Sequence, residues 1–451
     1  MLSFMDYKQT LEYLYNAAPA FEKVGVGAYK EGLSNTLALD EHFGHPHTKY
    51  KTIHVAGTNG KGSVSHTLAA LLQLAGYKVG LYTSPHLVDF NERIRVNGKP
   101  IEHEYVVRFV ENEKDFFAPL HPSFFELATA MAFKYFAEQQ VDIAVIEVGL
   151  GGRLDCTNII RPMLSVITNI SFDHTGMLGS TLAAIAAEKA GIIKEGVPVV
   201  IGEHTSETRP VFEQKASDMH APILFAEDCQ YVTASQPLTS TMGRRYHTSC
   251  FGVIDGELGG ECQERNVNTV LNCLLPLAKA MKREGMSVLK SNLKLIDCVR
   301  QAFSHVCEIT GLTGRWQKVG DSPLVICDTG HNVAGWQYLA GQIKDTYREL
   351  SNKGESHLYI VFGMVNDKDV STVLAMLPRD AVYFFTQADN HRAILSSDLK
   401  AMAVEYGLQG ESYDTVPEAY KAARAQAKEN DFVFVGGSSY VVADFLGMKD
   451  R

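Results

Sequence analysis

A glycine-rich segment near the start of the chain has the composition of a phosphate-binding loop. Glycines let a backbone approach an anion closely, and a helix that begins directly after them points its N–H groups at that anion. Lys61 can reach β- and γ-phosphates, and the hydroxyl of Ser63 can bind Mg²⁺. The segment departs from the Walker A pattern at two positions: Val55 takes the place of the first glycine, and Gly62 separates Lys61 from Ser63. The alternative interpretation is a strand–turn–helix segment that binds no ligand. The expected loop residues are Gly57, Thr58, Asn59, Gly60, Lys61, Gly62 and Ser63.

Other polar side chains stand at the ends of predicted strands, where open α/β sheets bind ligands. Ser84 and His86 follow one strand, Glu147 ends a second and His174 follows a third. A hydroxyl, a carboxylate, an imidazole and waters make a reasonable Mg²⁺ set, although imidazole is an unusual partner for this ion. The alternatives are a cap or ion pair for Glu147 and a structural hydrogen bond for His174. Lys189 ends a predicted helix, where spacing alone favours a solvated lysine that the helix dipole stabilises.

Alternating strands and helices must hold these residues. Strand 51–56, the glycine loop, helix 65–76 and strand 77–82 make a βαβ unit, which normally forms a parallel pair with a right-handed crossover. The alternation continues and predicts a doubly wound α/β sheet. Residues 222–262 are typical of a small β-rich subdomain. The other expected elements are a largely helical first 50 residues with a Gly-rich break at 24–27, helices 123–139, 182–190 and 266–305, strands 141–148, 164–169 and 197–201, and β pieces 231–239 and 247–253.

A second α/β pattern begins near residue 315. Turn residues at 310–314 favour a boundary there. We therefore expect an ATP-binding domain over 1–305, a linker and hinge over 306–314, and a second domain over 315–451. The expected elements of the second domain are strands 324–327, 357–362, 381–385 and 431–435 and helices 335–350, 370–376 and 416–427.

Length and composition limit the possible classes of protein. The chain has 451 residues, which favours two or three domains. A net charge of −10 disfavours nucleic acid or an anionic membrane as a partner. The N-terminal residues lack a signal-peptide pattern and no run of 18 apolar residues occurs, so we expect a cytoplasmic protein without a transmembrane helix. The eight scattered cysteines favour free thiols over a disulfide framework or a zinc site.

Several segments together resemble the Mur ligase superfamily and, more narrowly, the folylpolyglutamate synthase and dihydrofolate synthase family. The forms GTNGKGS at 57–63 and GLGGRLD at 149–155 are specific to the folate branch rather than to the cell-wall ligases. The resemblance runs in order from residue 57 to residue 440. It implies an N-terminal ATPase domain and a Rossmann-like C-terminal domain. The remaining matching segments are 83–86, 147–148, 173–174, 188–192, 314–317, 328–332, 367–369 and 437–440.

The resemblance implies an ATP-dependent ligase that adds L-glutamate to dihydropteroate, to reduced folates, or to both, through an acyl phosphate. It implies Mg²⁺, two ions in all, and a carbamylated Lys189 that holds one of them. Catalytic roles are implied for Lys61, Lys189 and His331. The implied ligand-binding residues are the loop 57–63 with Asn266, Arg315 and Asp328 for ATP, Ser63, Ser84, Glu147, His174 and Lys189 for metal, and Phe124, Phe125, Arg153, Asp155, Ser438 and Tyr440 for substrate.

The chain departs from the family pattern at two places. Cys262 stands where a histidine is frequent, and Thr329-Gly330 replaces an alanine-containing pair. Neither change removes a required charge. The rival interpretations are a Mur-type ligase for another acid, an ATPase that does not ligate, and a degenerate structural member of the family. The family is commonly monomeric, so we expect a monomer that binds small molecules.

Overall fold

The computed structural model describes residues 5–16, 32–238 and 242–448, so the Gly-rich break expected at 24–27 lies outside the described residues. The chain forms two compact units. The first comprises Met1–Ser235, Tyr246–Asp255 and Glu264–Leu312, and the second comprises Gln236–Arg245, Gly256–Gln263 and Thr313–Arg451. No helix of the described residues is long and apolar enough to cross a membrane.

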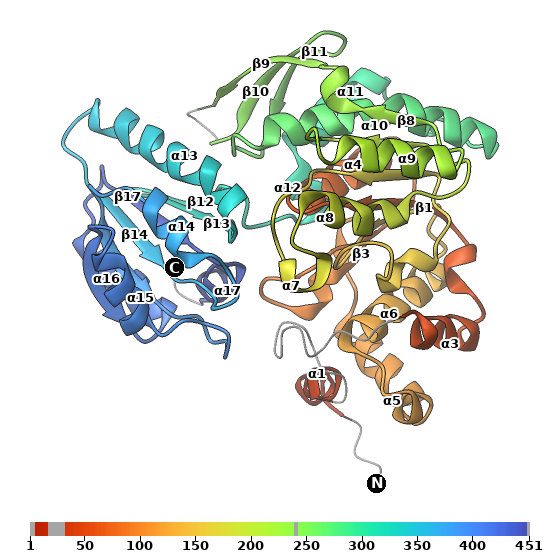
Figure 1. Ribbon diagram of the computed structural model, residues 1–451, viewed down its shortest axis with the longest axis horizontal. Coiled ribbons are helices and arrows are strands. Elements are labelled where there is room, and N and C mark those ends of the chain that lie inside the picture. The colour runs from red at the N-terminus through yellow and green to blue at the C-terminus, as the bar shows by residue number, and fades with distance from the viewer. Residues whose placement is uncertain (1–4, 17–31, 239–241, 449–451) are drawn as a thin grey trace. The chain divides into compact units, whose positions relative to one another are not determined.

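The first unit is built on an eight-stranded sheet with the order β4-β3-β2-β5-β1-β6-β7-β8 (Figure 1). Strands β2 to β8 of this order are parallel, and β3 and β4 form an antiparallel edge. The central strands are buried along their length, as expected for a parallel sheet covered on both faces. Their bounds are β1 Lys51–Ala56, β2 Val79–Tyr82, β3 Ile94–Val96, β4 Lys99–Pro100, β5 Ile143–Glu147, β6 Leu164–Ile167, β7 Val199–Ile201 and β8 Ile223–Phe225.

Helices cover both faces of this sheet. Helices α6, α8 and α9 pack on the face that carries Ala144, Ile146, Ile167 and Ile201. Helix α4 packs against β1, β2 and β5, with α11 and α12 against it (Figure 1). The helices of this unit are α1 Tyr7–Asn16, α3 Ser34–His42, α4 Lys61–Leu74, α5 His103–Leu120, α6 Phe124–Glu138, α7 Thr175–Leu178, α8 Leu182–Lys189, α9 Arg209–Asp218, α10 Gln263–Arg283, α11 Leu295–Ser304 and α12 Val306–Thr310.

Several boundaries differ from those expected. Helix α4 begins at Lys61 rather than at Ser65, because Gly60 adopts φ 82° and starts the helix directly after the loop. Five of the nine residues of the expected linker form helix α12. A hydrogen bond of 2.7 Å joins the hydroxyl of Thr310 in this helix to Nδ1 of His66 in α4. The β-rich segment is smaller than expected, because β8 joins the main sheet.

The remaining β pieces form a three-stranded sheet of order β11-β10-β9. Its strands are β9 Val232–Pro237, β10 Arg244–Thr248 and β11 Gly252–Gly256. The single β piece expected at 247–253 is wrong, because a turn separates the end of β10 from the start of β11 within it. None of the eight cysteines, all of which lie in described ranges, takes part in a disulfide.

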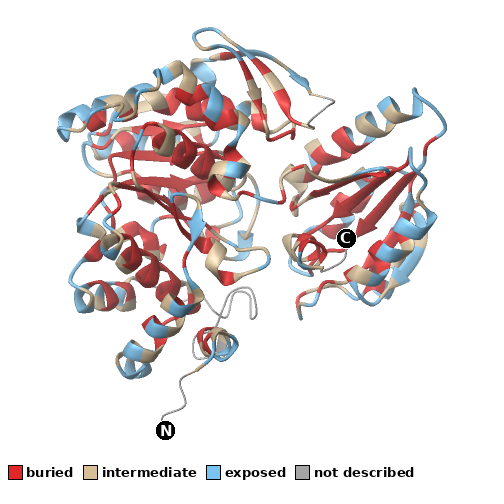
Figure 2. Ribbon diagram, turned by 180° about the vertical axis from the view of Figure 1, so that it is seen from behind, coloured by how far each residue is buried: buried red, intermediate tan, exposed pale blue. Residues whose placement is uncertain are grey.

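The second unit has a six-stranded sheet of order β12-β13-β17-β14-β15-β16, parallel except for β12. Figure 2 shows this sheet buried between helices whose outer faces are exposed. Its strands are β12 Gln317–Asp321, β13 Leu324–Asp328, β14 Leu358–Phe362, β15 Val382–Thr386, β16 Gln409–Tyr413 and β17 Phe432–Gly436. Its helices are α13 Val333–Ser351, α14 Val370–Met376, α15 Ser396–Val404, α16 Val416–Gln426 and α17 Ser439–Gly447.

The mixed α/β class with two parallel-rich sheets confirms the fold that the sequence predicted. Four elements of the second unit were not predicted: β12, α15, β16 and α17. Strands β12 and β16 lie at the two edges of the sheet and are mostly exposed or half-buried, so they lack the apolar run that marks a buried strand.

Candidate active site

The polar segments of the first unit meet beyond the carboxyl ends of four neighbouring strands of its sheet. Val55 pairs with Glu147, Ala56 pairs with Ile167, and Tyr82 pairs with Ile146. Because the four strands β2, β5, β1 and β6 are parallel, their carboxyl ends lie at the same end of the sheet. The register therefore places the loop after β1, the end of β5 and the segments after β2 and β6 beside one another.

Two glycines give the loop after β1 its shape. Gly57 has φ 148°, and a Cβ there would lie 1.8 Å from the hydroxyl oxygen of Thr168. Gly60 has φ 82°, and its Cβ would lie 2.3 Å from the Oδ1 atom of Asn266. Asn266, expected to contact ATP, therefore lies directly over the loop. The Nζ of Lys61 donates to the carbonyls of Gly57 and Thr58 at 3.1 Å each, so the ammonium lies over the loop's own carbonyls. Ser63 is buried in the first turn of α4.

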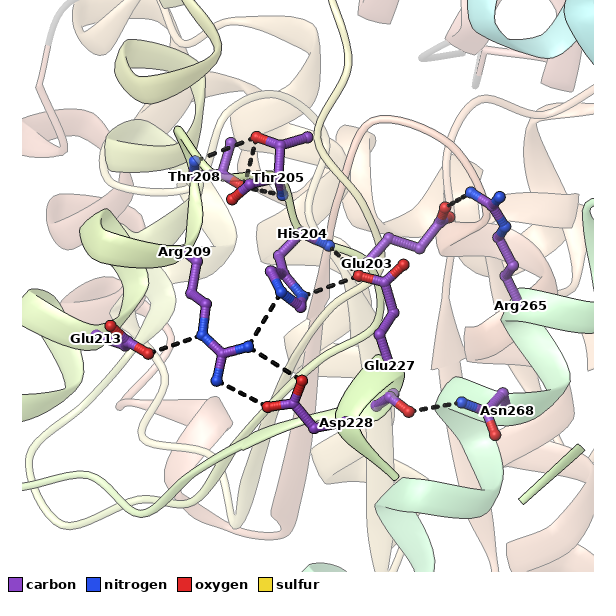
Figure 3. A network of polar contacts seen from close by, with 11 residues as sticks. Glu203, His204, Thr205, Thr208, Arg209, Glu213, Glu227, Asp228, Arg265 and Asn268 are labelled. Atoms are coloured by element: carbon purple, nitrogen blue, oxygen red, sulfur yellow. Dashed lines mark hydrogen bonds and ion pairs between the residues drawn. The ribbon is translucent and has the colours of Figure 1, made fainter. Parts of the chain in front are cut away.

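Thr168 and Asn169, which follow β6, hold this loop by hydrogen bonds. The Oδ1 atom of Asn169 accepts from the backbone N–H of Asn59 at 2.9 Å, and its Nδ2 donates to Oε1 of Glu203 at 3.2 Å. The second oxygen of Glu203 accepts from Arg265, in the first turn of α10 and next to Asn266 (Figure 3). The hydroxyl of Thr168 donates to the carbonyl of Asn59 at 2.5 Å. A continuous polar chain thus joins the loop to α10.

Lys189 is a buried residue of this site and not a solvated one. Its side chain leaves the end of α8, is 4% exposed, and donates from Nζ to the carbonyl oxygen of Gly57 at 2.8 Å. Burial and, second, the charge of Lys61 lower the pKa of Lys189 to about 7, while Asp173 and Asp155 act in the opposite direction. The interpretation of Lys189 as a solvated helix-end lysine is wrong.

The residues expected to bind metal are held by their strands and loops. Glu147 is 3% exposed at the end of an apolar strand, a position that is costly for a carboxylate without a cation or hydrogen-bond donors. His174 has φ 49°, a strained backbone region that often marks functional sites, and its N–H donates to Asp173 at 2.9 Å. Ser84 stands two residues after Tyr82. Mg²⁺ prefers oxygen ligands and keeps waters, so a buried carboxylate fits this ion.

Two further observations bear on this set. No group of three or more His, Cys, Asp and Glu side chains within 5–16, 32–238 and 242–448 could hold a metal ion by itself. His86 turns to other partners: its Nδ1 accepts from Nε of Arg93 at 2.7 Å, and its Nε2 lies 3.2 Å from the hydroxyl of Tyr15. A metal at the carboxyl ends of these strands would therefore need oxygens from a bound phosphate or from water as well.

Four of the residues expected to bind substrate belong to the first unit, on helix α6 and in the loop after β5. Phe124 is buried against Tyr15, with ring centroids 4.9 Å apart, and Phe125 lies so close to Gly149 that a Cβ there would be 2.4 Å from the ring. Arg153 is exposed and pairs with Glu188 at 2.9 Å. Asp155 is buried and accepts from the N–H groups of Leu150 and Thr157, so it shapes the loop. Burial raises the pKa of Asp155, and these hydrogen bonds oppose the shift.

In the second unit, three of the expected residues gather at the end of β13. Asp328 is held by backbone N–H groups of Trp316 at 2.7 Å and Gly330 at 2.8 Å; burial raises its pKa and Arg315 lowers it. His331 lies 3.0 Å from the carbonyl of Thr329 through Nδ1. The hydroxyl of Thr329, which the family pattern lacks, accepts from Arg315. This substitution therefore adds a partner for the arginine.

Ser438 and Tyr440 stand after β17. Ser438 caps helix α17 by accepting from the N–H of Val441 at 3.2 Å. Tyr440 is half-buried and meets Arg392. The sequence pattern did not mark Arg392, Asn169, Glu203 or Arg265 as members of a site, because each is joined to its partner only by folding.

Comparisons with known proteins agree with this arrangement. Residues 55–228 match the Mur ligase middle domain, and residues 314–439 match the Mur ligase, glutamate ligase domain. The chain is 34% identical over 426 residues to the dihydrofolate synthase/folylpolyglutamate synthase of Bacillus subtilis (strain 168), covering 92% of this chain and 94% of the relative.

Solved structures show the same fold over nearly the whole chain. The structure of Escherichia coli FolC in complex with DHPP and ADP matches with a TM-score of 0.78 and 29% identity, covering 98% of this chain and 97% of that one. Mycobacterium tuberculosis folylpolyglutamate synthase complexed with ADP matches with a TM-score of 0.82 and 29% identity, covering 99% and 98%.

A glycine loop on a parallel sheet, followed by a second α/β unit of the glutamate ligase type, defines an ATP-dependent ligase of the Mur ligase class. Within that class, the chain belongs to the dihydrofolate synthase/folylpolyglutamate synthase family.

Proposed function

We propose that this enzyme joins the amine of L-glutamate to the carboxylate of dihydropteroate and to the terminal glutamate carboxylate of reduced folates. The observation that carries this proposal is the loop 57–63, held by Asn169 and flanked by Lys189, in a chain that matches ligases of this kind over nearly its full length. The two acids share a free carboxylate that must be activated before an amine can attack it. The same chemistry therefore serves both reactions.

In the proposed reaction, an oxygen of the acid attacks the γ-phosphorus of ATP, and ADP leaves with the bridging oxygen. The amine then attacks the carbonyl carbon of the acyl phosphate, inorganic phosphate leaves, and the nitrogen loses a proton. Lys61 neutralises phosphate charge during the transfer, and Asn266 fixes the nucleotide over the loop. The second unit contributes Arg315, Asp328 and His331 as ligand-binding residues.

We propose that Ser63, Ser84, Glu147, His174 and Lys189 hold two Mg²⁺ ions. When bound, Mg²⁺ neutralises charge on the transferred phosphoryl group. Lys189 would act as a carbamate: its neutral amine forms an N–C bond to CO₂ and releases a proton, which converts a cation into an anionic oxygen ligand. Burial beside Lys61 supports this step because it favours the neutral amine.

Aromatic side chains support a pterin-type acid as the substrate. Phe125 lies against Gly149 of the 149–155 loop and offers flat apolar surface for a ring, while Phe124, next to it in α6, is buried against Tyr15. We further propose that the enzyme acts as a cytoplasmic monomer.

Product analysis tests the proposal. Incubation with MgATP, L-glutamate and either dihydropteroate or tetrahydrofolate is expected to give a new species, heavier than the acid by one glutamyl residue, in mass spectrometry. Products from both acids would establish the dual activity. A product from neither acid, with ATP still consumed, would replace the proposal with a ligase for another acid or with an uncoupled ATPase.

A further inference from the structure

The segment that leads into helix α10 belongs to the second unit, although nearly all of the helix belongs to the first. Residues 256–263 are grouped with the second unit, and α10 begins at Gln263. The first turn of this helix carries Asn266, whose Oδ1 atom lies so close to Gly60 of the phosphate loop that a Cβ there would be 2.3 Å away. The position of the segment therefore bears on where Asn266 lies over the loop.

Gln342 of helix α13 holds this segment through both ends of its side-chain amide. Its Nε2 donates to the carbonyl oxygen of Gly259 at 3.1 Å, and its Oε1 accepts from the backbone N–H of Glu261 at 3.2 Å. Gln342 is only 8% exposed, and a buried amide is costly unless donor and acceptor both have partners. The N–H of Gln263 then donates to the carbonyl oxygen of Gly260 at 2.9 Å, so the held segment turns directly into α10.

The segment is also packed closely where Gln342 holds it. A Cβ at Gly259 would lie 1.6 Å from the carbonyl oxygen of Met242 and 2.8 Å from the ring atom Cδ1 of Trp316. The N–H of Trp316 in turn donates to Oδ2 of Asp328 at 2.7 Å. The same short segment therefore lies against the residue that holds Asp328 and continues into the helix that carries Asn266.

Small displacements of this segment matter because Asn266 and Asp328 are both expected to bind the nucleotide. The side-chain amide of Asn266 can make a hydrogen bond only within a few tenths of an ångström of the right distance. A helix whose start is fixed by two hydrogen bonds presents such a group in one position, and the ligand need not order it on binding.

We infer that Gln342 is a positioning residue for nucleotide binding: by holding residues 259–261 on α13, it fixes the start of α10 and so the place of Asn266 over the phosphate loop. The inference rests on the proposed function, in which Asn266 contacts the nucleotide. It gives the second unit an influence on nucleotide affinity that acts through the chain and requires no contact between Gln342 and the ligand.

The test is a double-mutant cycle that measures the dissociation constant of ADP, in the presence of Mg²⁺, by titration calorimetry. Gln342→Met keeps the length of the side chain and removes both hydrogen bonds. We expect it to weaken ADP binding about 5-fold and Asn266→Ala to weaken it about 10-fold. Because Gln342 acts through Asn266, the double variant should match Asn266→Ala within about 2-fold, instead of showing the loss of about 50-fold that independent effects would give.

The control is Gln337→Met, which makes the same exchange at an exposed position of the same helix and should leave the ADP affinity at the wild-type value. If Gln342→Met does not fold, Gln342→Glu completes the cycle, since it keeps an acceptor for the N–H of Glu261 and lacks the donor to Gly259.

The outcomes separate this inference from the proposed function. Wild-type protein that does not bind ADP would overturn the nucleotide site and the inference with it. Binding of ADP without a glutamylated product would overturn the proposed substrates and leave the cycle readable. Unchanged ADP affinity in either single variant, or losses that multiply in the double variant, would overturn the inference alone.

Discussion

The Nζ atom of Lys189 donates a 2.8 Å hydrogen bond to the carbonyl oxygen of Gly57, the first residue of the phosphate loop. Lys61 donates to the same oxygen at 3.1 Å. Two lysines from distant parts of the chain therefore share one carbonyl, one of them inside the protein and the other at the start of a helix. This contact ties a group suited to carbamylation to the loop expected to hold the phosphates.

Replacing Lys189 tests whether that contact matters for the reaction. Lys189→Ala is expected to reduce ligation at least about 100-fold, because the proposed anionic ligand is lost. Added acetate should restore part of the activity, since it supplies a carboxylate where the carbamate would be. Lys282→Ala, an exposed lysine in the last turn of α10, is the control and should retain wild-type turnover. Retention of more than half the activity by Lys189→Ala would contradict the proposed role.

Replacing Lys61 tests the phosphate loop directly. Lys61→Ala removes the cation that lies over the loop and should reduce ATP-dependent phosphate release about 100-fold or more. The same assay with the Lys282 variant separates this effect from a general loss of positive charge. Unchanged phosphate release in Lys61→Ala would mean that the loop does not handle phosphate.

The Asn169–Glu203–Arg265 chain predicts a separable effect on nucleotide affinity. Glu203→Ala leaves Asn169 without its side-chain anchor and should raise the KM for ATP about 5- to 10-fold, with a smaller change in kcat. Glu203→Gln retains an acceptor for Asn169, so its KM for ATP should lie between that of the wild type and that of Glu203→Ala. The control is Glu213→Ala, which removes a carboxylate that pairs with Arg209 at 2.8 Å and leaves Asn169, Glu203 and Arg265 in place (Figure 3). Equal KM values in the two alanine variants would rule out this anchoring role.

His54 gives the first unit a dependence of stability on pH. Its ring is fully buried in β1, with Nε2 2.8 Å from the hydroxyl of Thr157, and burial and then Lys194 lower its pKa from 6.5 to about 3. The unfolded chain therefore binds a proton between pH 6.5 and 3 that the folded chain does not. Stability from this group is full above about pH 6.5 and falls as the pH decreases, by about 2 kcal/mol at pH 5.

Chemical denaturation at pH 7.5 and pH 5 measures this difference. His54→Gln cannot titrate, so its free energy of unfolding should depend on pH less than that of the wild type by about 2 kcal/mol. His247→Gln, which replaces an exposed histidine, should retain the wild-type dependence. Identical pH dependence in His54→Gln and the wild type would show that this ring does not titrate on unfolding.

The features that the sequence predicted well are those with a local signal. Buried strands such as β5 and β14 have apolar runs of four or five residues, and Lys61 follows a strand and two glycines, so their types could be assigned from a short window. Lys189 shows the limit of such reasoning. Its spacing reports only that it ends a helix, whereas its burial depends on where α8 packs against the sheet.

Residues of the site that were missed have no local signal. Glu203 and Arg265 are separated by 62 positions. Each looks like an ordinary charged loop or helix residue until the chain is folded. His86 shows what position alone leaves open: it follows β2 as Ser84 does, but its ring accepts a hydrogen bond from Arg93 and lies 3.2 Å from the hydroxyl of Tyr15.

The measurement that tests the central claim most directly is the stoichiometry of phosphate release from MgATP, with and without L-glutamate, in the presence of dihydropteroate or tetrahydrofolate. The account predicts release only when glutamate and an acid are both present, with one phosphate for each amide bond formed. Phosphate release that is indifferent to both substrates would contradict it.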